Sequence, residues 1–149
     1  MRDILLIIHI LAAAVWIGGA TGQAAFGSAV VASSNAAAAT WMRRLVRMGQ
    51  VYYTPAAIVV LASGVGLVLN SSLYEFEHTF VVIGVLMVLI AGGLGGRLYA
   101  PKAREAADAY EGGDTTAGNA AAATITRAAY VEMGLLVVTV AAMVYRWGV

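Results

Sequence analysis

His9 is the residue whose type and position most directly indicate chemistry, because it lies within a long apolar stretch of the sequence. A polar side chain at such a position in a membrane segment normally faces a partner, a cavity or a ligand. On a helix, the residues that share its face include Trp16, Gly19 and Ala20. Small residues let another backbone or a flat ligand come close, so this face is a candidate binding site. The alternative is a packing face in which His9 is hydrogen-bonded to a neighbouring helix or to water.

Glu132 is the only acidic residue well inside an apolar stretch, about five residues from its start. A carboxylate inside a membrane is costly unless it is paired or protonated. Arg97 ends another apolar stretch on the same side, whereas Arg127 lies five residues from Glu132 and faces elsewhere on its helix. We therefore predict a structural ion pair between Arg97 and Glu132, with proton handling by Glu132 as the alternative.

His78 is the only other histidine, and it stands at the start of an apolar stretch beside Glu75 and Glu77. Histidine is a common axial ligand of haem iron, so His9 and His78 are the candidate metal-binding residues. The alternative for His78 is an interfacial loop residue. No catalytic residues are predicted, because the hydroxyl, carboxyl and imidazole groups do not converge at any spacing that requires catalysis.

The composition identifies the environment in which these residues must work. Of the 149 residues, 61% are apolar and 11% are charged, against about 25% charged residues in soluble proteins. The chain is therefore expected to be an integral membrane protein that lies in a lipid bilayer. The absence of cysteine excludes disulfides, iron–sulfur clusters and thiolate zinc sites. A net charge of +1 without a basic block excludes nucleic acid as a partner.

Four stretches are long enough to cross a bilayer, which takes about 20 residues of helix. Each must be helical, because in hydrocarbon every backbone group has to be paired within its own segment. The fold class is therefore all-α, a polytopic membrane protein with an up-down bundle of four transmembrane helices in one domain, 1–149. The expected helices cover about residues 4–31, 50–69, 79–99 and 128–147. The longer connections cover about residues 32–49 and 100–127.

The basic residues predict the orientation of the chain, because cytoplasmic connections are rich in lysine and arginine. The two longer connections and the helix ends beside them hold Arg43, Arg44, Arg47, Arg97, Lys102, Arg104 and Arg127. The opposite side has only Arg2 and Arg146. We therefore expect a protein of the cell (inner) membrane with both termini outside and the longer connections cytoplasmic. Tyr52 and Tyr53 are expected to be anchors at the membrane interface.

The connections also carry helix signals. Asn35 and Asn119 each begin an alanine run, which is typical of a helix with an asparagine cap. Beyond Pro101 the helical pattern is expected to continue until residues 111–114, which read Glu-Gly-Gly-Asp. Two pairs of glycines four residues apart, Gly18 with Gly22 and Gly92 with Gly96, indicate close helix packing, either within the bundle or across a homodimer.

His9, Trp16 and the pair Gly18-Gly19 together form an H-x6-W-x-G-G motif at the start of a four-helix chain. This motif resembles the first helix of the CopD superfamily of copper-resistance proteins. That superfamily includes HemJ-type protoporphyrinogen oxidases and a branch of uncharacterised small integral membrane proteins, to which the likeness is closest. The resemblance continues through Arg43-Arg44-Leu45, Pro55-Ala56, Gly64-x-Gly66-Leu67 and the segment from Arg97 to Pro101.

The resemblance implies different ligands in different branches. In HemJ-like proteins the histidine of the first helix is associated with b-type haem, a role that maps onto His9. The lysine that those proteins carry early in the third helix has no counterpart in residues 77–80, which speaks against oxidase activity of that kind. CopD-like proteins imply copper, which favours Met, His and Cys ligands; this chain has no cysteine and no Met-x-x-Met pair.

Three functions follow as expectations. The first is a membrane protein that binds b-type haem through His9, with Trp16, Gly19 and Ala20 in the pocket, for redox chemistry or haem handling. The second is a cofactor-free membrane scaffold or accessory subunit whose small-residue faces bind a second copy or another membrane protein. The third is a copper or small-solute permease, which the scarcity of polar groups within the apolar stretches makes the weakest of the three.

Overall fold

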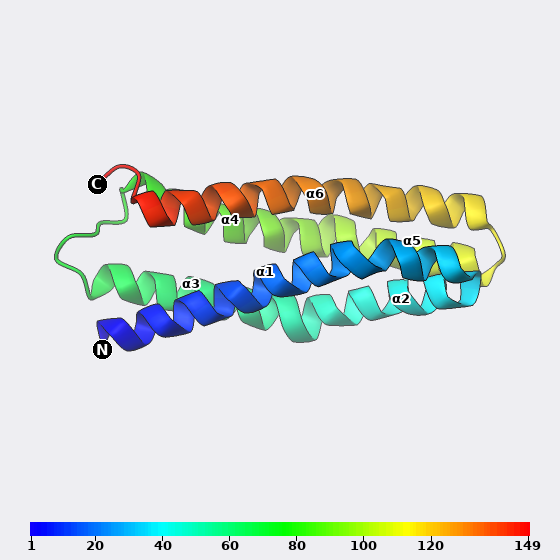
Figure 1. Ribbon diagram of the computed structural model, residues 1–149, viewed down its shortest axis with the longest axis horizontal. Coiled ribbons are helices and arrows are strands. Elements are labelled where there is room, and N and C mark those ends of the chain that lie inside the picture. Colours follow the sequence, from blue (N-terminus) through cyan, green and yellow to red (C-terminus); the bar gives the residue numbers. More distant parts are fainter.

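The computed structural model describes residues 1–149, of which 88% are helical, and it contains no strands. This confirms the all-helical class predicted from the sequence. The elements in chain order are α1 Arg2–Ser33, α2 Asn35–Met48, η1 Gly49–Tyr53, α3 Thr54–Leu69, α4 Thr79–Leu94, η2 Gly95–Tyr99, α5 Ala100–Glu111 and α6 Thr115–Tyr145 (Figure 1).

These elements join into four long rods, because α2 continues through η1 into α3, and α4 continues through η2 into α5. The rods have 31 to 35 residues, and all four are long and apolar enough to cross a membrane. They run up and down beside one another, with both termini at the same end of the bundle (Figure 1). The number of long apolar helices agrees with the prediction.

The two longer connections, residues 32–49 and 100–127, are mostly helical and extend the four long helices. Polar and charged side chains do not interrupt a helix that is rich in alanine. The helix after Pro101 ends at Glu111, at the predicted break. The predicted asparagine caps are wrong: Ser34 accepts the capping bond of α2 from the Ala37 amide, and Asp114 caps α6.

Two five-residue π turns, η1 and η2, lie inside the second and third rods. Both have the sequence Gly-x-x-x-Tyr-x-Pro, from Gly49 to Pro55 and from Gly95 to Pro101. A proline has no amide hydrogen and its ring clashes with the carbonyl four residues earlier, so a wider preceding turn relieves the clash. Each π turn ends two residues before the proline, at a tyrosine, which is Tyr53 in η1 and Tyr99 in η2.

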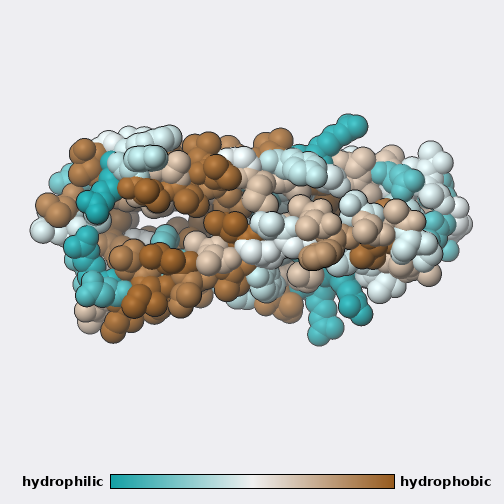
Figure 2. All heavy atoms as spheres, viewed as in Figure 1, coloured by the Kyte–Doolittle hydropathy of each residue, from teal (hydrophilic) through white to brown (hydrophobic).

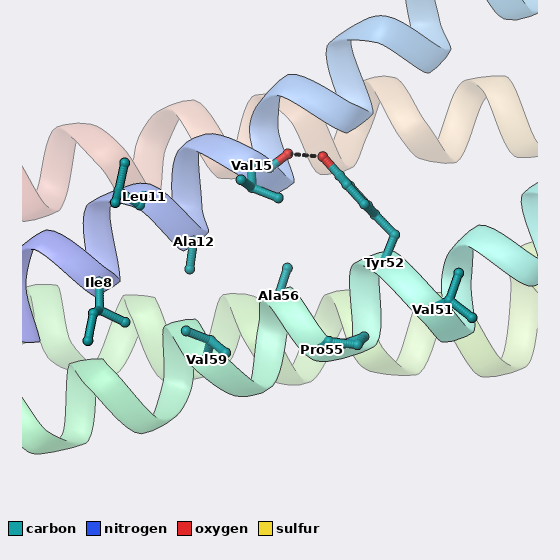
Figure 3. A pocket seen from close by; sticks show the side chains of 9 residues that line it. All are labelled: Ile8, Leu11, Ala12, Val15, Val51, Tyr52, Pro55, Ala56 and Val59. Carbon is teal, nitrogen blue, oxygen red and sulfur yellow. Dashed lines mark hydrogen bonds between the residues drawn. The ribbon is translucent and has the colours of Figure 1, made fainter.

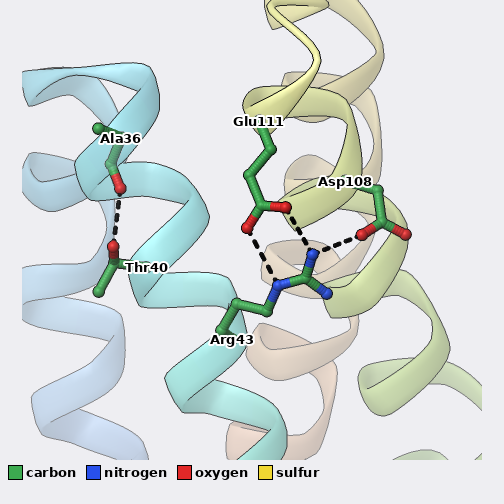
Figure 4. Close-up of polar contacts among 5 residues, drawn as sticks. All are labelled: Ala36, Thr40, Arg43, Asp108 and Glu111. Atoms are coloured by element: carbon green, nitrogen blue, oxygen red, sulfur yellow. Dashed lines mark hydrogen bonds and ion pairs between the residues drawn. The ribbon is translucent and has the colours of Figure 1, made fainter.

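The end of the bundle that holds α2, α5 and the start of α6 is polar outside, and we call residues 23–49 and 97–127 the polar half. Its core is mostly alanine, which allows the helices to approach closely. The buried members are Ala38, Ala39, Met42, Ala103, Ala106, Ala107, Tyr110, Ala121 and Ala122. On its surface, Arg43 donates to Asp108 at 2.6 Å and to Glu111 at 2.7 Å, bonds that raise the pKa of Arg43 (Figure 4).

The rest of the chain, which we call the apolar half, exposes large aliphatic side chains along all four rods (Figure 2). Its helices pack mainly in two pairs, α1 with α3 and α4 with α6. Figure 2 shows a hollow between these two pairs. A small buried cluster around Trp16 joins the two pairs. A second small buried cluster, around Phe80, closes the end of the bundle at which the termini lie.

Candidate functional site

His9 is held against α3 by hydrogen bonds of its Nδ1 atom. Nδ1 lies 3.0 Å from the carbonyl oxygen of Val60 and 3.1 Å from the hydroxyl oxygen of Ser63. A carbonyl oxygen can only accept, so Nδ1 carries the hydrogen and donates it. In the neutral imidazole, Nε2 then has a free electron pair, which is the form that binds a metal ion.

The sequence of α3 makes room for this ring. A Cβ atom at Gly64 would lie 3.2 Å from Cε1 of His9, a tighter approach than side-chain atoms usually make. Ser63, next to it, is buried and donates its own hydroxyl to Val59, so it is fixed in place. Neither Val60 nor Ser63 was predicted as a partner of His9. A serine next to a glycine in an otherwise apolar span was the available signal.

The predicted face of α1 does turn toward the other helices. Trp16 is 5% exposed and packs with Ala56, Met87, Ala91 and Leu136, which come from α3, α4 and α6. It therefore lies at the centre of the apolar half.

Gly19 is covered by a side chain of the same protein. A Cβ atom there would lie 2.5 Å from Cε1 of Tyr52, whose hydroxyl donates to the carbonyl oxygen of Val15. The glycine thus makes room for the Tyr52 ring. Ala20 is half-buried.

An open apolar groove of about 420 Å³ runs between α1 and the second rod, beside this contact (Figure 3). Its lining comprises Ile8, Leu11, Ala12, Val15, Val51, Tyr52, Pro55, Ala56 and Val59. His9 is not part of the lining, so the groove and the imidazole are separate features.

His78 has a local structural role at the start of α4. Its Nδ1 atom accepts a hydrogen bond of 3.0 Å from the backbone amide of Glu75, and its ring stacks on Phe80. His9, by contrast, is bonded to α3, so the two histidines serve different elements. No group of three or more His, Asp or Glu side chains converges anywhere in the chain.

Glu132 is paired with a tyrosine and not with an arginine. The hydroxyl of Tyr99 donates to Oε2 of Glu132 at 2.6 Å, and the chain forms no ion pair between Arg97 and Glu132. The predicted ion pair is wrong for a geometric reason: Arg97 lies two residues before Tyr99, which puts it on the opposite side of the helix. Arg97 is exposed.

Tyr53 is the tyrosine at the matching position of the other π turn, η1. Its hydroxyl is buried and has no hydrogen-bond partner. Tyr53 packs beside the Trp16 cluster, so it faces the interior. The prediction that Tyr53 is an anchor at the membrane interface is therefore wrong. The repeated Gly-x-x-x-Tyr-x-Pro motif was the signal that could have found both tyrosines.

The glycine pairs predicted to pack helices do not do so within this chain. Cβ atoms at Gly18, Gly22, Gly92 and Gly96 would meet nothing within 4 Å.

Comparison with protein-family models, with curated proteins and with solved structures finds no match to this chain.

Proposed function

We propose that this chain is an integral membrane protein that holds a b-type haem through His9. Four rods of 31 to 35 residues exceed the roughly 20 residues that cross a bilayer, so each leaves more than ten residues outside it. Exposed Arg47, Arg97 and Arg127 mark where the apolar half ends. Figure 2 shows hydrophilic side chains that project above and below the molecule to the right of its centre, beyond the brown apolar part. Arginines at this border favour an arrangement with the polar half in the cytoplasm and both termini outside.

The topology can be tested with single cysteines, because the chain has none of its own. Ser72 lies in the connection between α3 and α4, and Thr116 lies at the start of α6; both are exposed. In intact cells, a membrane-impermeant maleimide should label a Ser72→Cys variant and spare a Thr116→Cys variant until the membrane is permeabilised. Equal labelling of both before permeabilisation would contradict the arrangement.

The observation that carries the haem proposal is the hydrogen bond from Nδ1 of His9 to the Val60 carbonyl. Histidines that bind metal commonly donate their other ring nitrogen to a carbonyl, which fixes the ring and leaves Nε2 for the metal. A b-type haem needs an imidazole ligand and no covalent attachment through cysteine, and this chain supplies one fixed imidazole and has no cysteine.

Among the other residues predicted for the pocket, Trp16 is an interior wall, whereas Gly19 is covered by Tyr52. The Nδ1 atom of His78 already accepts a hydrogen bond from the Glu75 amide, so its electron pair is not free to bind a metal ion. His9 is therefore the one axial ligand proposed. Haem bound there would supply one-electron redox chemistry, and His9 would hold and orient it.

An absorption spectrum of the purified protein in detergent tests the proposal. The oxidised and dithionite-reduced wild type should show a Soret band and reduced α and β bands, and a His9→Ala variant should lose them. A His78→Ala variant is the matched control and should keep them. Circular dichroism shows whether each variant is folded. A wild type that stays colourless after hemin is added would refute the proposal.

A cofactor-free scaffold is the second candidate, and four glycines with open space beside them favour it. Gly18 and Gly22 on α1, Gly92 on α4 and Gly96 on η2 leave room where a second copy or another membrane protein could pack closely. A Gly22→Cys variant should then form a disulfide-linked dimer in native membranes. A Val138→Cys variant, which places the thiol on an exposed part of α6, is the control and should stay monomeric. Equal cross-linking of both variants would speak against a specific interface.

A further inference from the structure

We infer that Glu132, Tyr99 and Tyr53 form a buried proton-binding site where the apolar half meets the polar half, and that this site exchanges its proton with the aqueous phase on the side of the polar half. The inference rests on the proposed membrane insertion but not on haem. Its components are a carboxyl group bonded to one tyrosine and a second tyrosine whose buried hydroxyl lacks a partner.

No positive charge faces the carboxyl group. From η2, Tyr99 donates to Glu132 while Arg97 is exposed on the far side of the helix. From η1, the titratable groups are Tyr53 and Tyr52, and the hydroxyl of Tyr52 is bonded to Val15. Neither α4 nor residues 10–33 of α1 contain a titratable side chain, and Arg127 on α6 is exposed. In this setting, only a proton can neutralise Glu132.

The unpartnered hydroxyl of Tyr53 indicates a further group at the site. A buried hydroxyl without a hydrogen bond costs free energy, so native proteins pair such groups with protein atoms or with water. An internal water needs two to four polar partners. The buried hydroxyl of Tyr53 is one such partner, and we infer that the carboxyl of Glu132 is another, because Tyr53 packs against the cluster to which Leu136, one turn from Glu132, belongs. A water between them would complete the bonds of Tyr53 and carry the proton to or from Glu132.

The surrounding packing makes the exchange one-sided. Toward the outer end, the buried side chains of Trp16, Met87 and Leu136 include no titratable group, and Leu136 lies one turn of α6 beyond Glu132. Toward the polar half, Arg127 is exposed five residues before Glu132 on α6, and Tyr99 itself belongs to the residues of the polar half. A proton therefore has a short route to the polar half and an apolar barrier on the other side.

Infrared difference spectroscopy of the protein in oriented proteoliposomes tests this site. We expect the carbonyl band of a protonated carboxylic acid to appear and disappear reversibly between about pH 5 and about pH 9. A Glu132→Gln variant should lose this band, and a Tyr99→Phe variant should shift it to higher frequency, because a hydrogen bond to the carboxyl group is removed. A Glu105→Gln variant, which changes an exposed carboxylate bonded to Lys102, is the control and should keep the band.

The second tyrosine and the sidedness give independent results. A Tyr53→Phe variant should keep the band but slow its shift on transfer to D2O, because the water loses a partner. A pH jump on the side of the polar half should change the band, whereas a jump on the opposite side should leave it unchanged. If Glu132→Gln fails to fold, the frequency shift in Tyr99→Phe identifies the carboxyl group. A band that does not titrate, or that persists in folded Glu132→Gln, would overturn the inference; both outcomes are independent of haem binding.

Discussion

Replacing Gly19 by alanine should destabilise the protein through a single contact. The added Cβ atom would lie 2.5 Å from the Tyr52 ring, so the ring must move by about 1 Å to reach ordinary contact. The hydroxyl of Tyr52 is bonded to the Val15 carbonyl at 2.5 Å, so this movement breaks or stretches that hydrogen bond.

The magnitude can be worked from a neighbouring position. Alanine is favoured over glycine within a helix by about 1 kcal/mol, but a Gly18→Ala variant gains this as well, and its Cβ atom meets nothing within 4 Å. The difference between the two variants therefore isolates the clash. If the ring moves, the hydrogen bond is lost at a cost of about 1 kcal/mol; if it stays, the contact is overpacked at a cost of about 1–3 kcal/mol, so the two costs are alternatives and do not add. We expect Gly19→Ala to be less stable than Gly18→Ala by about 1–3 kcal/mol.

Unfolding of both variants by sodium dodecyl sulfate in mixed micelles, followed by circular dichroism, measures this difference. Truncation of the ring supplies the control: in a Tyr52→Ala background the two alanine variants should be equally stable, because the atoms that clash are gone. Equal stability of the two variants with Tyr52 intact would refute the reasoning. The same would hold if the difference persisted without the ring.

Three further predictions concern the polar half. Removing the cap of α6 by Asp114→Ala should cost about 1 kcal/mol of stability, measured by thermal unfolding, whereas Asp114→Asn should retain most of it. A Tyr110→Phe variant loses the hydrogen bond to Asn119, which is worth about 1 kcal/mol. Burial raises the pKa of Tyr110 above its ordinary value of 10.0, so the wild type should lose stability as the pH rises above that value, and the variant should lose less. An Arg43→Gln variant should lower the melting temperature slightly at low salt and by less at high salt, because the bonds to Glu111 are exposed and screened.

The sequence was a reliable guide where one property dominates. Apolar length alone predicts four long helices, and the small residues that follow His9 at helical spacing predict the face that turns inward. The end of the third rod at Glu111 was predicted because two glycines and an aspartate follow it.

The hydrogen-bond partners of His9 and Glu132 could not be predicted from the sequence in this way. His9 bonds to a backbone carbonyl, that of Val60, and every residue has one, so the sequence does not mark it. Glu132 was assigned to Arg97 because both lie on the same side of the membrane, but depth does not specify the face of a helix. The π turn that ends in Tyr99 decides the face, and a glycine and a proline six residues apart are usually taken for separate helix breakers.

The two π turns also affect how one helix can serve two different cores. Each inserts about one residue relative to a regular α-helix, which advances the side chains beyond it by about 100° around the axis. The second rod thereby presents Ala38, Ala39 and Met42 to the alanine core at one end and Ala56 to the tryptophan cluster at the other. Each of the two rods with a π turn thus contains two helical phases joined at a fixed offset. Deleting one residue from a π turn would leave a longer regular helix, but only one of its two ends could still be in phase with its neighbours.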